Sequence, residues 1–292
     1  MTVLERPQAR TYLSRKNRRA ATRSLQYLAM TAYIVFLGFP LLFLVTAAFK
    51  TPQELQSLTS GFFPQSLNLE NFAIAFAKTN LLGAMFNSIV VSACSTAIVV
   101  LISMPAAYAL SRTKSRIRTI SSIWILLSQM FPFILIVIPL FLLMTNLGLI
   151  NSLVGLVLVY SVWCLPFALW MLQGHMASIP IELEEAGAMD GASRFRVLRQ
   201  IVLPLLAPGL IATSLFSFIT AYSDFFFALV TPRTPALHTL PLALARFVGA
   251  EGIVQLGPLA AGSLLATIPS LLFFAFIQRK LSSGLLSGAV KG

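Results

Sequence analysis

The sequence predicts an all-α integral membrane protein with six transmembrane helices. Of its 292 residues, 57% are hydrophobic and only 10% are charged, and the mean hydropathy is +0.85. Soluble domains carry roughly 25% charged residues. A helix that crosses the hydrocarbon core needs about 20 apolar residues. Six stretches of about that length are present, at 26–49, 84–110, 119–145, 150–172, 205–230 and 259–280.

The first stretch is expected to be retained as a span. It is longer than the core of a typical signal peptide, and no small-residue cleavage site follows it. We therefore expect one domain in three parts: a basic tail over 1–25, the six-helix region over 26–280 and a C-terminal tail over 281–292. Cys94 and Cys164 lie inside spans without metal-ligand spacing, so both are expected to be buried thiols, and no metal site is predicted.

The second and third stretches differ in their small and kinking residues. Residues 84–110 are rich in Ser and Ala, and small residues let membrane helices approach closely. This span is expected at the centre of the bundle. Residues 119–145 contain Gln129, Pro132 and Pro139. Proline inside a membrane helix frees carbonyl groups and bends the helix, so either a hinge or a packing kink is expected there.

The basic residues predict which ends of the spans face the cytoplasm. Of the 21 lysines and arginines, 17 fall in the two terminal segments and in the connections after the second and fourth spans. The other four are Lys50, Lys78, Arg233 and Arg246. Cytoplasmic loops are enriched in Lys and Arg. Both termini and the connection over 173–204 are therefore predicted to be cytoplasmic, and the alternation disfavours nucleic-acid binding as the reason for the net charge of +12.

Two long segments, 51–83 and 231–258, are predicted on the outer face. The first mixes aromatic and polar residues in a way that suits a short amphipathic element, and the second is interrupted by Pro and Gly. Loops of more than about 15 residues in a compact fold tend to be functional. Each segment is expected either to receive an extracytoplasmic partner or to cover the bundle passively.

Asp224 is the one charged residue predicted well inside a span, where it follows Tyr222 and Ser223. A membrane-buried acid is costly and usually faces the bundle interior or a watery cavity. Two interpretations stay open. Either Tyr222, Ser223 and Asp224 lie on a translocation path, or the carboxylate bonds to nearby backbone or hydroxyl groups, or sits near the outer end of the helix.

The cytoplasmic connection 173–204 is the most polar part of the chain and predicts a helix–turn–helix. Pro180 suits the first turn of a helix, and acidic residues favour the positive end that follows. Asp190-Gly191 is a turn signal, and Ser193 is suited to cap a second short helix. The charges that flank the turn are Glu182, Glu184 and Glu185 before it, and Arg194, Arg196 and Arg199 after it. Such a segment must lie in water or against another protein.

Within this connection, Glu185-Ala186-Gly187, Gly191, Ile201 and Leu203-Pro204 resemble a known loop. It is the Glu-Ala-Ala…Gly…Ile-x-Leu-Pro loop of permease subunits in bacterial ATP-binding-cassette (ABC) importers. The string over 180–192 is similar to the carbohydrate-uptake branch, the maltose-type permeases. Shorter stretches agree, so that the resemblance covers roughly residues 30–292: Asn87-Ser88, Ala106-Ala107-Tyr108-Ala109 with Arg112, Phe131-Pro132, Leu147-Gly148-Leu149, Leu165-Pro166-Phe167 and 287–292.

The resemblance implies the type I ABC importer permease fold, in a multi-pass protein of the bacterial cell (inner) membrane. It implies one permease of a heterodimer, with a second permease subunit, two ABC ATPase subunits and an extracytoplasmic sugar-binding protein as partners. This chain would then be no enzyme and hold no cofactor, since ATP and Mg are bound by the ATPase subunits.

In that family the loop forms a coupling helix that docks in a groove of the ATPase. Carried over to this sequence, the contact residues are Glu184, Glu185, Ala186, Gly187, Asp190, Gly191 and Ala192. Arg194 with Leu203-Pro204 sets the return into the fifth span. Two positions depart from the family. Gly187 stands where Ala is usual, and glycine in a helix interior costs up to about 1 kcal/mol relative to alanine. Tyr222-Ser223-Asp224 stands where Trp-Asn-acid is frequent.

Two other classes of membrane protein have less support in the sequence. A proton- or sodium-coupled secondary transporter normally carries several intramembrane ionisable groups and often repeated halves, and the sequence shows one acid and no visible repeat. An intramembrane enzyme lacks support because neither His-Glu-x-x-His nor Gly-x-Ser-x-Gly occurs; His175 and His238 are expected at solvated or interfacial positions. The substrate stays open among disaccharides, oligosaccharides and glycerol phosphate, the last in a glycerol-phosphate-type importer.

Overall fold

The computed structural model describes residues 9–57, 59–113, 116–231, 233–249 and 252–289. Within these residues the regular elements are helical, apart from an isolated antiparallel bridge between Val248 and Val254. Five helices are long and apolar enough to span a membrane, and a sixth span arises if one bent helix pair is counted as a single crossing. The predicted all-α membrane fold is confirmed.

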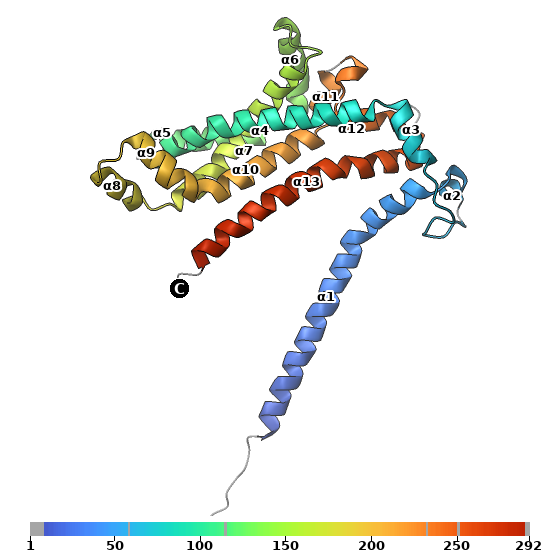
Figure 1. The fold of residues 1–292 in the computed structure, drawn as a ribbon, viewed down its shortest axis with the longest axis horizontal. Helices are drawn as coiled ribbons and strands as arrows, with labels where there is room; N and C mark the ends of the chain where they lie inside the picture. The colour runs from blue at the N-terminus through green and yellow to red at the C-terminus, as the bar shows by residue number, and fades with distance from the viewer. Residues whose placement is uncertain (1–8, 58, 114–115, 232, 250–251, 290–292) are drawn as a thin grey trace, which may run out of the picture.

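Four long helices form the bundle and lie side by side in Figure 1: α4 (Leu81–Arg112), α7 (Leu153–Ala177), α10 (Leu203–Ser223) and α13 (Leu256–Ala289). Helix α4 contacts the other three. Several of its small residues are buried, including Ser92 and Ser95 with no exposed area. Ser95 Oγ donates to Val91 O at 2.7 Å, so the hydroxyl is satisfied inside the bundle. The predicted central position of this span is confirmed.

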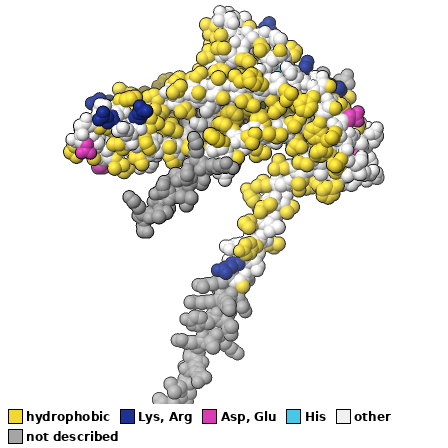
Figure 2. Space-filling view, in the orientation of Figure 1, with side chains coloured by type: hydrophobic (Ala, Val, Ile, Leu, Met, Phe, Trp, Pro, Cys, Tyr) yellow, Lys and Arg dark blue, Asp and Glu magenta, His cyan; other side chains and the backbone are white. Residues whose placement is uncertain are grey.

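Helix α1 (Ala9–Phe49) leaves the bundle, as Figure 1 shows. The C-terminal end of α1 packs on the start of α13, where Ala47 and Ala48 meet Ala260 and Ala261. None of its most apolar window is buried in this chain. In Figure 2 hydrophobic side chains cover the visible surface of the bundle, and charged side chains gather towards its ends. This distribution suits an apolar belt within a membrane.

The predicted third span is broken and not one continuous helix. Helices α5 (Arg116–Met130) and α6 (Phe133–Asn146) meet at an angle of 94°. Pro132 is the N-cap of α6. It lacks an N–H and disfavours helical backbone in the residue before it. Pro139 stays inside α6, so only one of the two prolines marks the break.

The predicted fifth span is also shorter than expected. Helix α10 ends at Ser223, Asp224 is extended with φ −71° and ψ 133°, and the short α11 (Phe226–Val230) follows. Asp224 therefore lies at a helix end and not well inside a span. Hydropathy hid this end because Phe225–Val230 is as apolar as the helix before it.

Other boundaries and one burial prediction also change. Helix α7 continues five residues beyond the predicted end at 172. Residues 281–289, predicted as a tail, continue α13, while 290–292 and 1–8 lie outside the described residues. Cys164 is buried as predicted, but Cys94 is exposed. The prediction for Cys94 was wrong because the face of α4 on which it lies is not covered by this chain.

The end of the bundle opposite α8 and α9 carries the two segments predicted to be external (Figure 1). They form short helices: α2 (Pro52–Gln56), α3 (Glu70–Lys78), a 3-10 turn η2 (Pro235–Leu237), α12 (Leu240–Leu244) and a 3-10 turn η3 (Ala245–Phe247). The buried Asn71 amide donates to Ala48 O at 3.0 Å and Lys50 O at 2.7 Å. This bond pair fixes α3 against the end of α1.

Candidate functional site

The candidate site is the polar hairpin between α7 and α10, residues 178–202, which we call the hairpin. It consists of α8 (Glu182–Met189), α9 (Arg194–Val197) and a π-helical turn, η1 (Leu198–Val202). Gly191 turns the chain with φ +81°, a region that glycine adopts without steric cost. The Ser193 side chain accepts the Arg196 N–H. The predicted helix–turn–helix is confirmed, although Pro180 lies before the first helical turn.

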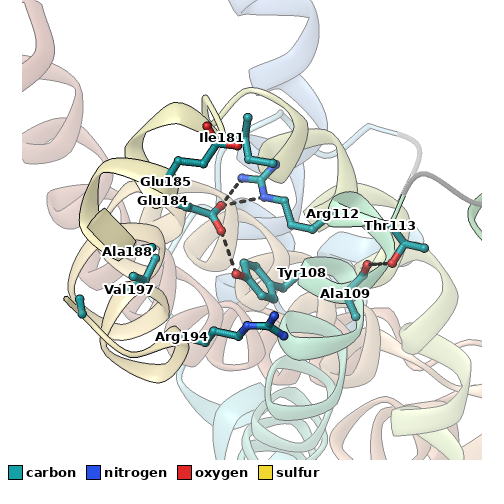
Figure 3. Close-up of a pocket in the computed structure, with 11 residues that line it drawn as sticks. Tyr108, Ala109, Arg112, Thr113, Ile181, Glu184, Glu185, Ala188, Arg194 and Val197 are labelled. Carbon is teal, nitrogen blue, oxygen red and sulfur yellow. Dashed lines mark hydrogen bonds and ion pairs between the residues drawn. The ribbon is translucent and has the colours of Figure 1, made fainter. Parts of the chain in front are cut away.

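The Glu184 carboxylate points back to the bundle and does not face solvent (Figure 3). Arg112 Nη2 lies 2.6 Å from Glu184 Oε1, and Arg112 Nε donates to the same oxygen at 2.7 Å. Tyr108 OH donates to Oε2 at 2.8 Å. The Arg112 and Glu184 side chains are only 17% and 10% exposed. Hydrogen bonds of this charge-assisted kind are about twice as strong as neutral ones.

The same guanidinium also reaches the end of α7. Arg112 Nη2 donates to Ile179 O at 3.2 Å and Nη1 donates to Met176 O at 3.5 Å. Arg112 is the last residue of α4. One side chain therefore joins the ends of α4 and α7 to the first turn of α8. Sequence reasoning placed Glu184 on the partner-facing surface and missed Arg112 and Tyr108, although both lie in motifs shared with the family.

Apolar contacts hold the hairpin to the start of α10. Val197, Val202 and Leu206 are buried in one cluster with Leu172 and Met176 of α7. A Cβ added at Gly187 would lie 2.6 Å from Ile201 Cδ1. The departure from Ala at this position thus has a packing reason, since α8 and η1 approach too closely there for a methyl group without movement of Ile201.

The outer surface of the hairpin mixes acids with large apolar side chains. Glu185 and Asp190 are exposed, while Met189 is 83% and Phe195 71% exposed. Leu183 is exposed as well. Sequence reasoning did not single out these three apolar residues, although apolar side chains in so polar a segment were a visible signal.

A cavity of about 520 Å³ opens beside the Glu184 ion pair. Tyr108, Arg112, Glu185 and Arg194 are among the residues that line it, and Arg194 extends beside Tyr108 in Figure 3. Ala186 is exposed and Ala192 packs against the apolar cluster. Leu203 and Pro204 form the first turn of α10, the return into the bundle.

The structure does not gather Tyr222, Ser223 and Asp224 into one site. Asp224 Oδ1 accepts hydrogen bonds from Tyr160 OH and from the Phe227 N–H, both at 2.9 Å. Tyr222 OH donates to Ala266 O on α13 at 3.0 Å, and Ser223 is exposed. The contacts of Asp224 are those of a residue that caps α11 and bonds a hydroxyl of α7. A role for these residues on a translocation path stays a prediction.

Among the residues that the structure describes, no group of three or more His, Cys, Asp and Glu side chains could hold a metal ion. His175 Nδ1 lies 3.1 Å from Met171 O within α7. His238 directly follows η2, in the second segment predicted to be external. Neither histidine is therefore placed as a metal ligand here.

Comparison with known proteins shows the family to which the chain belongs. Residues 99–286 match the family described as "Binding-protein-dependent transport system inner membrane component". The chain is 36% identical over 265 residues to the diacetylchitobiose uptake system permease protein DasC of Streptomyces coelicolor, with 90% of this chain and 96% of that protein covered. It is 35% identical over 256 residues to the trehalose/maltose transport system permease protein MalG of Thermococcus litoralis, with 87% and 91% covered.

The fold agrees with that of a bacterial ABC transporter involved in the import of the polysaccharide alginate. The TM-score is 0.74 at 19% identity, with 95% of this chain and 99% of that chain covered. ABC permeases work in complexes with an ATPase and a periplasmic binding protein, and ATP is hydrolysed in the separate ATPase subunit. This chain accordingly belongs to the binding-protein-dependent transport system inner membrane components and is a multi-pass permease subunit of an ABC importer.

Proposed function

We propose that this chain is one of two permease subunits of an ATP-driven sugar importer. It forms half of the translocation pathway and receives the ATPase through residues 180–204. The observation that carries the sugar assignment is near full-length similarity, at 35–36% identity, to permeases named for diacetylchitobiose and for trehalose/maltose. A glycerol-phosphate-type importer is the alternative within the same family.

The exposed surface of the hairpin supports docking of the ATPase there. Apolar area exposed to water costs roughly 25 cal/mol per Å², and Met189 and Phe195 are 83% and 71% exposed. The charges around them exclude lipid as their cover. A protein groove that buries these side chains and meets Glu185 and Asp190 with basic residues satisfies both features. The docking surface then consists of Glu185, Ala186, Gly187, Asp190, Gly191 and Ala192 with these apolar neighbours, and Glu184 supports it from behind.

Helix α1 supports a second permease subunit. It leaves the bundle with none of its most apolar window buried by this chain (Figures 1 and 2). One bundle also supplies only one wall of a pathway. In the proposed assembly two related permeases, two ATPase subunits and one extracytoplasmic sugar-binding protein work together, and α1 packs on the second permease.

The proposed mechanism is mechanical. ATP binding draws the ATPase pair together, the docked hairpin moves as a rigid lever, and the bundle changes from inward-facing to outward-facing. A nucleotide drives such a change only through its different affinity for the two states. The chemistry therefore stays in the ATPase, and this chain converts a displacement at the hairpin into access across the membrane.

Charge reversal tests the docking surface. Glu185→Lys and Asp190→Lys are expected to abolish sugar uptake in vesicles that hold the full complex, while the permease still reaches the membrane. Glu70→Lys, the same change at the far end of the bundle, is the matched control. Normal uptake in both hairpin variants would contradict the docking proposal.

The substrate is tested on the intact complex. A sugar or short oligosaccharide is expected in the extracytoplasmic receptor when the complex is purified and its small molecule is identified by mass spectrometry. Glycerol phosphate in that receptor would establish the alternative. Uptake that survives ATP depletion but stops when the proton gradient is dissipated would instead indicate a secondary transporter.

A further inference from the structure

We propose that Arg112, Tyr108 and Glu184 form a clamp that makes α8 a rigid extension of α4 and α7, so that displacement of the hairpin moves these two spans together. The inference rests on the proposed coupling role of the hairpin and deepens it. It names Arg112 and Tyr108 as positioning residues that act through Glu184.

The chain connectivity shows why a clamp is needed. Helix α8 is joined to α7 through residues 178–181 and to α10 through α9 and η1, but α4 has no covalent link to it. Short backbone bonds close the turn after α7, from the Ser178 N–H to His175 O and from the Ile179 N–H to Met176 O. These bonds fix the end of α7 and leave the direction of α8 to its other contacts.

The guanidinium of Arg112 fixes the direction of α8 relative to α4 and α7. It binds the Glu184 carboxylate at 2.6 and 2.7 Å and the carbonyl groups of Met176 and Ile179 at 3.5 and 3.2 Å. Its planar fork holds several acceptors in fixed relative positions. Tyr108 OH, one turn earlier on α4, holds the second carboxylate oxygen. Both oxygens of Glu184 are therefore fixed by α4.

The contacts of α8 with η1, the helical turn that leads into α10, are of another kind. They are apolar, as in the approach of Gly187 to Ile201. The energy of apolar packing depends on the area buried and not on the direction of any bond. A displacement of α8 is thus passed to α4 and α7 through oriented hydrogen bonds, while its apolar contact with η1 fixes no direction.

Helices α4 and α7 are themselves bound to each other, so a displacement of one is passed to the other. They pack along their lengths, and Ser95 Oγ of α4 donates to Val157 O of α7 at 3.3 Å. At the far end of α4, Asn87 Nδ2 donates to Ala236 O at 2.8 Å and His238 O at 3.0 Å. One helix therefore connects the clamp at its last residue with the outer segment near its first turns.

The test measures transport and ATP hydrolysis together in the reconstituted complex of both permeases, the ATPases and the sugar-binding protein. Glu184→Gln keeps the size of the side chain and removes its charge, and Arg112→Lys keeps the charge and removes the fork. Both variants are expected to retain bound ATPase but to lose at least about tenfold in sugar imported per ATP hydrolysed. Glu184→Gln leaves the Arg112 charge without its partner, and Arg112→Lys loses the fork that binds the carboxylate and two carbonyl groups together. Glu182→Gln, an exposed acid in the same turn, is the control and keeps the wild-type ratio.

A charge swap makes the test specific. Arg112→Glu combined with Glu184→Arg is expected to restore more of the transport-to-hydrolysis ratio than either single change retains. An unchanged ratio in both Glu184→Gln and Arg112→Lys would overturn the clamp. If Glu185→Lys also left uptake unchanged, the proposed docking would fail with it; if Glu185→Lys abolished uptake, the clamp alone would be wrong.

A distance measurement covers the case in which the Arg112 variant does not assemble. Spin labels at Thr113→Cys and Glu182→Cys, in a Cys94→Ser background, report the separation of α4 and α8. With the clamp intact, this distance is expected to stay the same between the nucleotide-free and ATP-bound complex. It is expected to broaden in the Glu184→Gln variant, and a distance that changes with nucleotide in the intact clamp would overturn the proposal.

Discussion

The two ends of α4 are held to the chain by different chemistry. At the hairpin end, Arg112 meets a carboxylate at 2.6 Å and its charge is partly buried. At the end predicted to be external, which we call the outer end, Asn87 donates to the carbonyl groups of Ala236 and His238, and Ser88 Oγ accepts the Leu240 N–H at 2.7 Å. The first attachment is ionic and depends on both partners, whereas the second is made of neutral bonds to backbone.

This difference predicts how much stability is lost when the contacts at each end are broken. A neutral hydrogen bond contributes about 0.5–1.5 kcal/mol net, and its loss is felt locally. Loss of one partner of a buried ion pair is more costly because it leaves an uncompensated charge. We therefore expect loss of the outer attachment, at Asn87 and Ser88, to act locally. Loss of the inner attachment, at Arg112, is expected to decide whether α4 and α8 move as one.

The largest expected effect comes from breaking the inner attachment. Arg112→Met is expected to destabilise the permease by about 2–3 kcal/mol, below the range for a fully buried pair because the side chains are 17% and 10% exposed. Thermal unfolding of the purified complex, followed by tryptophan fluorescence, measures it. Adding Glu184→Gln should recover at least half of the loss, because no unpaired charge then remains. A double variant as unstable as Arg112→Met would show that packing and not charge dominates.

Breaking the outer attachment should cost less and act locally. Asn87→Ala leaves the carbonyl groups of Ala236 and His238 without their donor, at about 1–2 kcal/mol. Hydrogen exchange is expected to rise in 235–244 and to stay unchanged in 178–190. Equal changes in both segments would erase the distinction between the two ends.

Acidification should loosen the outer end through His238. Burial, with the nearby Arg246, lowers the pKa of His238 below its ordinary value of 6.5. The unfolded segment then binds more protons than the folded one as the pH falls through 6.5, so stability decreases on acidification. After correction for the slower intrinsic exchange of amides at lower pH, the protection of 235–247 against hydrogen exchange is expected to be weaker at pH 5.5 than at pH 7.5. His238→Asn should flatten this dependence and keep the backbone carbonyl that Asn87 binds.

The smallest effect is expected where α8 packs on η1 within the hairpin. Gly187→Ala gains about 1 kcal/mol of helix propensity, but its new methyl group lies 2.6 Å from Ile201 Cδ1. The two terms oppose each other, and the net change in unfolding free energy should stay within about 1 kcal/mol. Gly187→Ala combined with Ile201→Val removes the clash and should be more stable than Gly187→Ala in the same unfolding assay. Equal stability of the two variants would mean that the close approach carries no cost.

Local signals predicted the hairpin well. The turn at Asp190-Gly191 and the cap at Ser193 depend on residues within a few positions, and both occur as expected. The partner of Glu184 could not be predicted in this way, because Arg112 lies 72 positions away and only the packing of α4 against α7 brings it near. Adjacent acids in one helix turn, Glu184 and Glu185, thus have opposite surroundings.

The prolines also show that local sequence alone does not predict where a helix bends. Pro105, Pro139 and Pro166 remain inside helices, while Pro132 marks a 94° bend. The residue type alone does not separate these cases. Phe133, directly after the bend, packs on Phe227 with ring centroids 5.2 Å apart and on Trp163 at 6.1 Å. These contacts come from α11 and α7, far along the chain.

The sequence by itself determined the class of protein, the approximate spans and the polar hairpin, because hydropathy, charge and turn chemistry act over short stretches of chain. Tertiary structure decided which way Glu184 faces, where α10 stops and how α5 and α6 diverge. Each of these depends on side chains that are distant in sequence and meet only when the helices pack, and hydropathy along 205–230 gives no sign of where α10 ends.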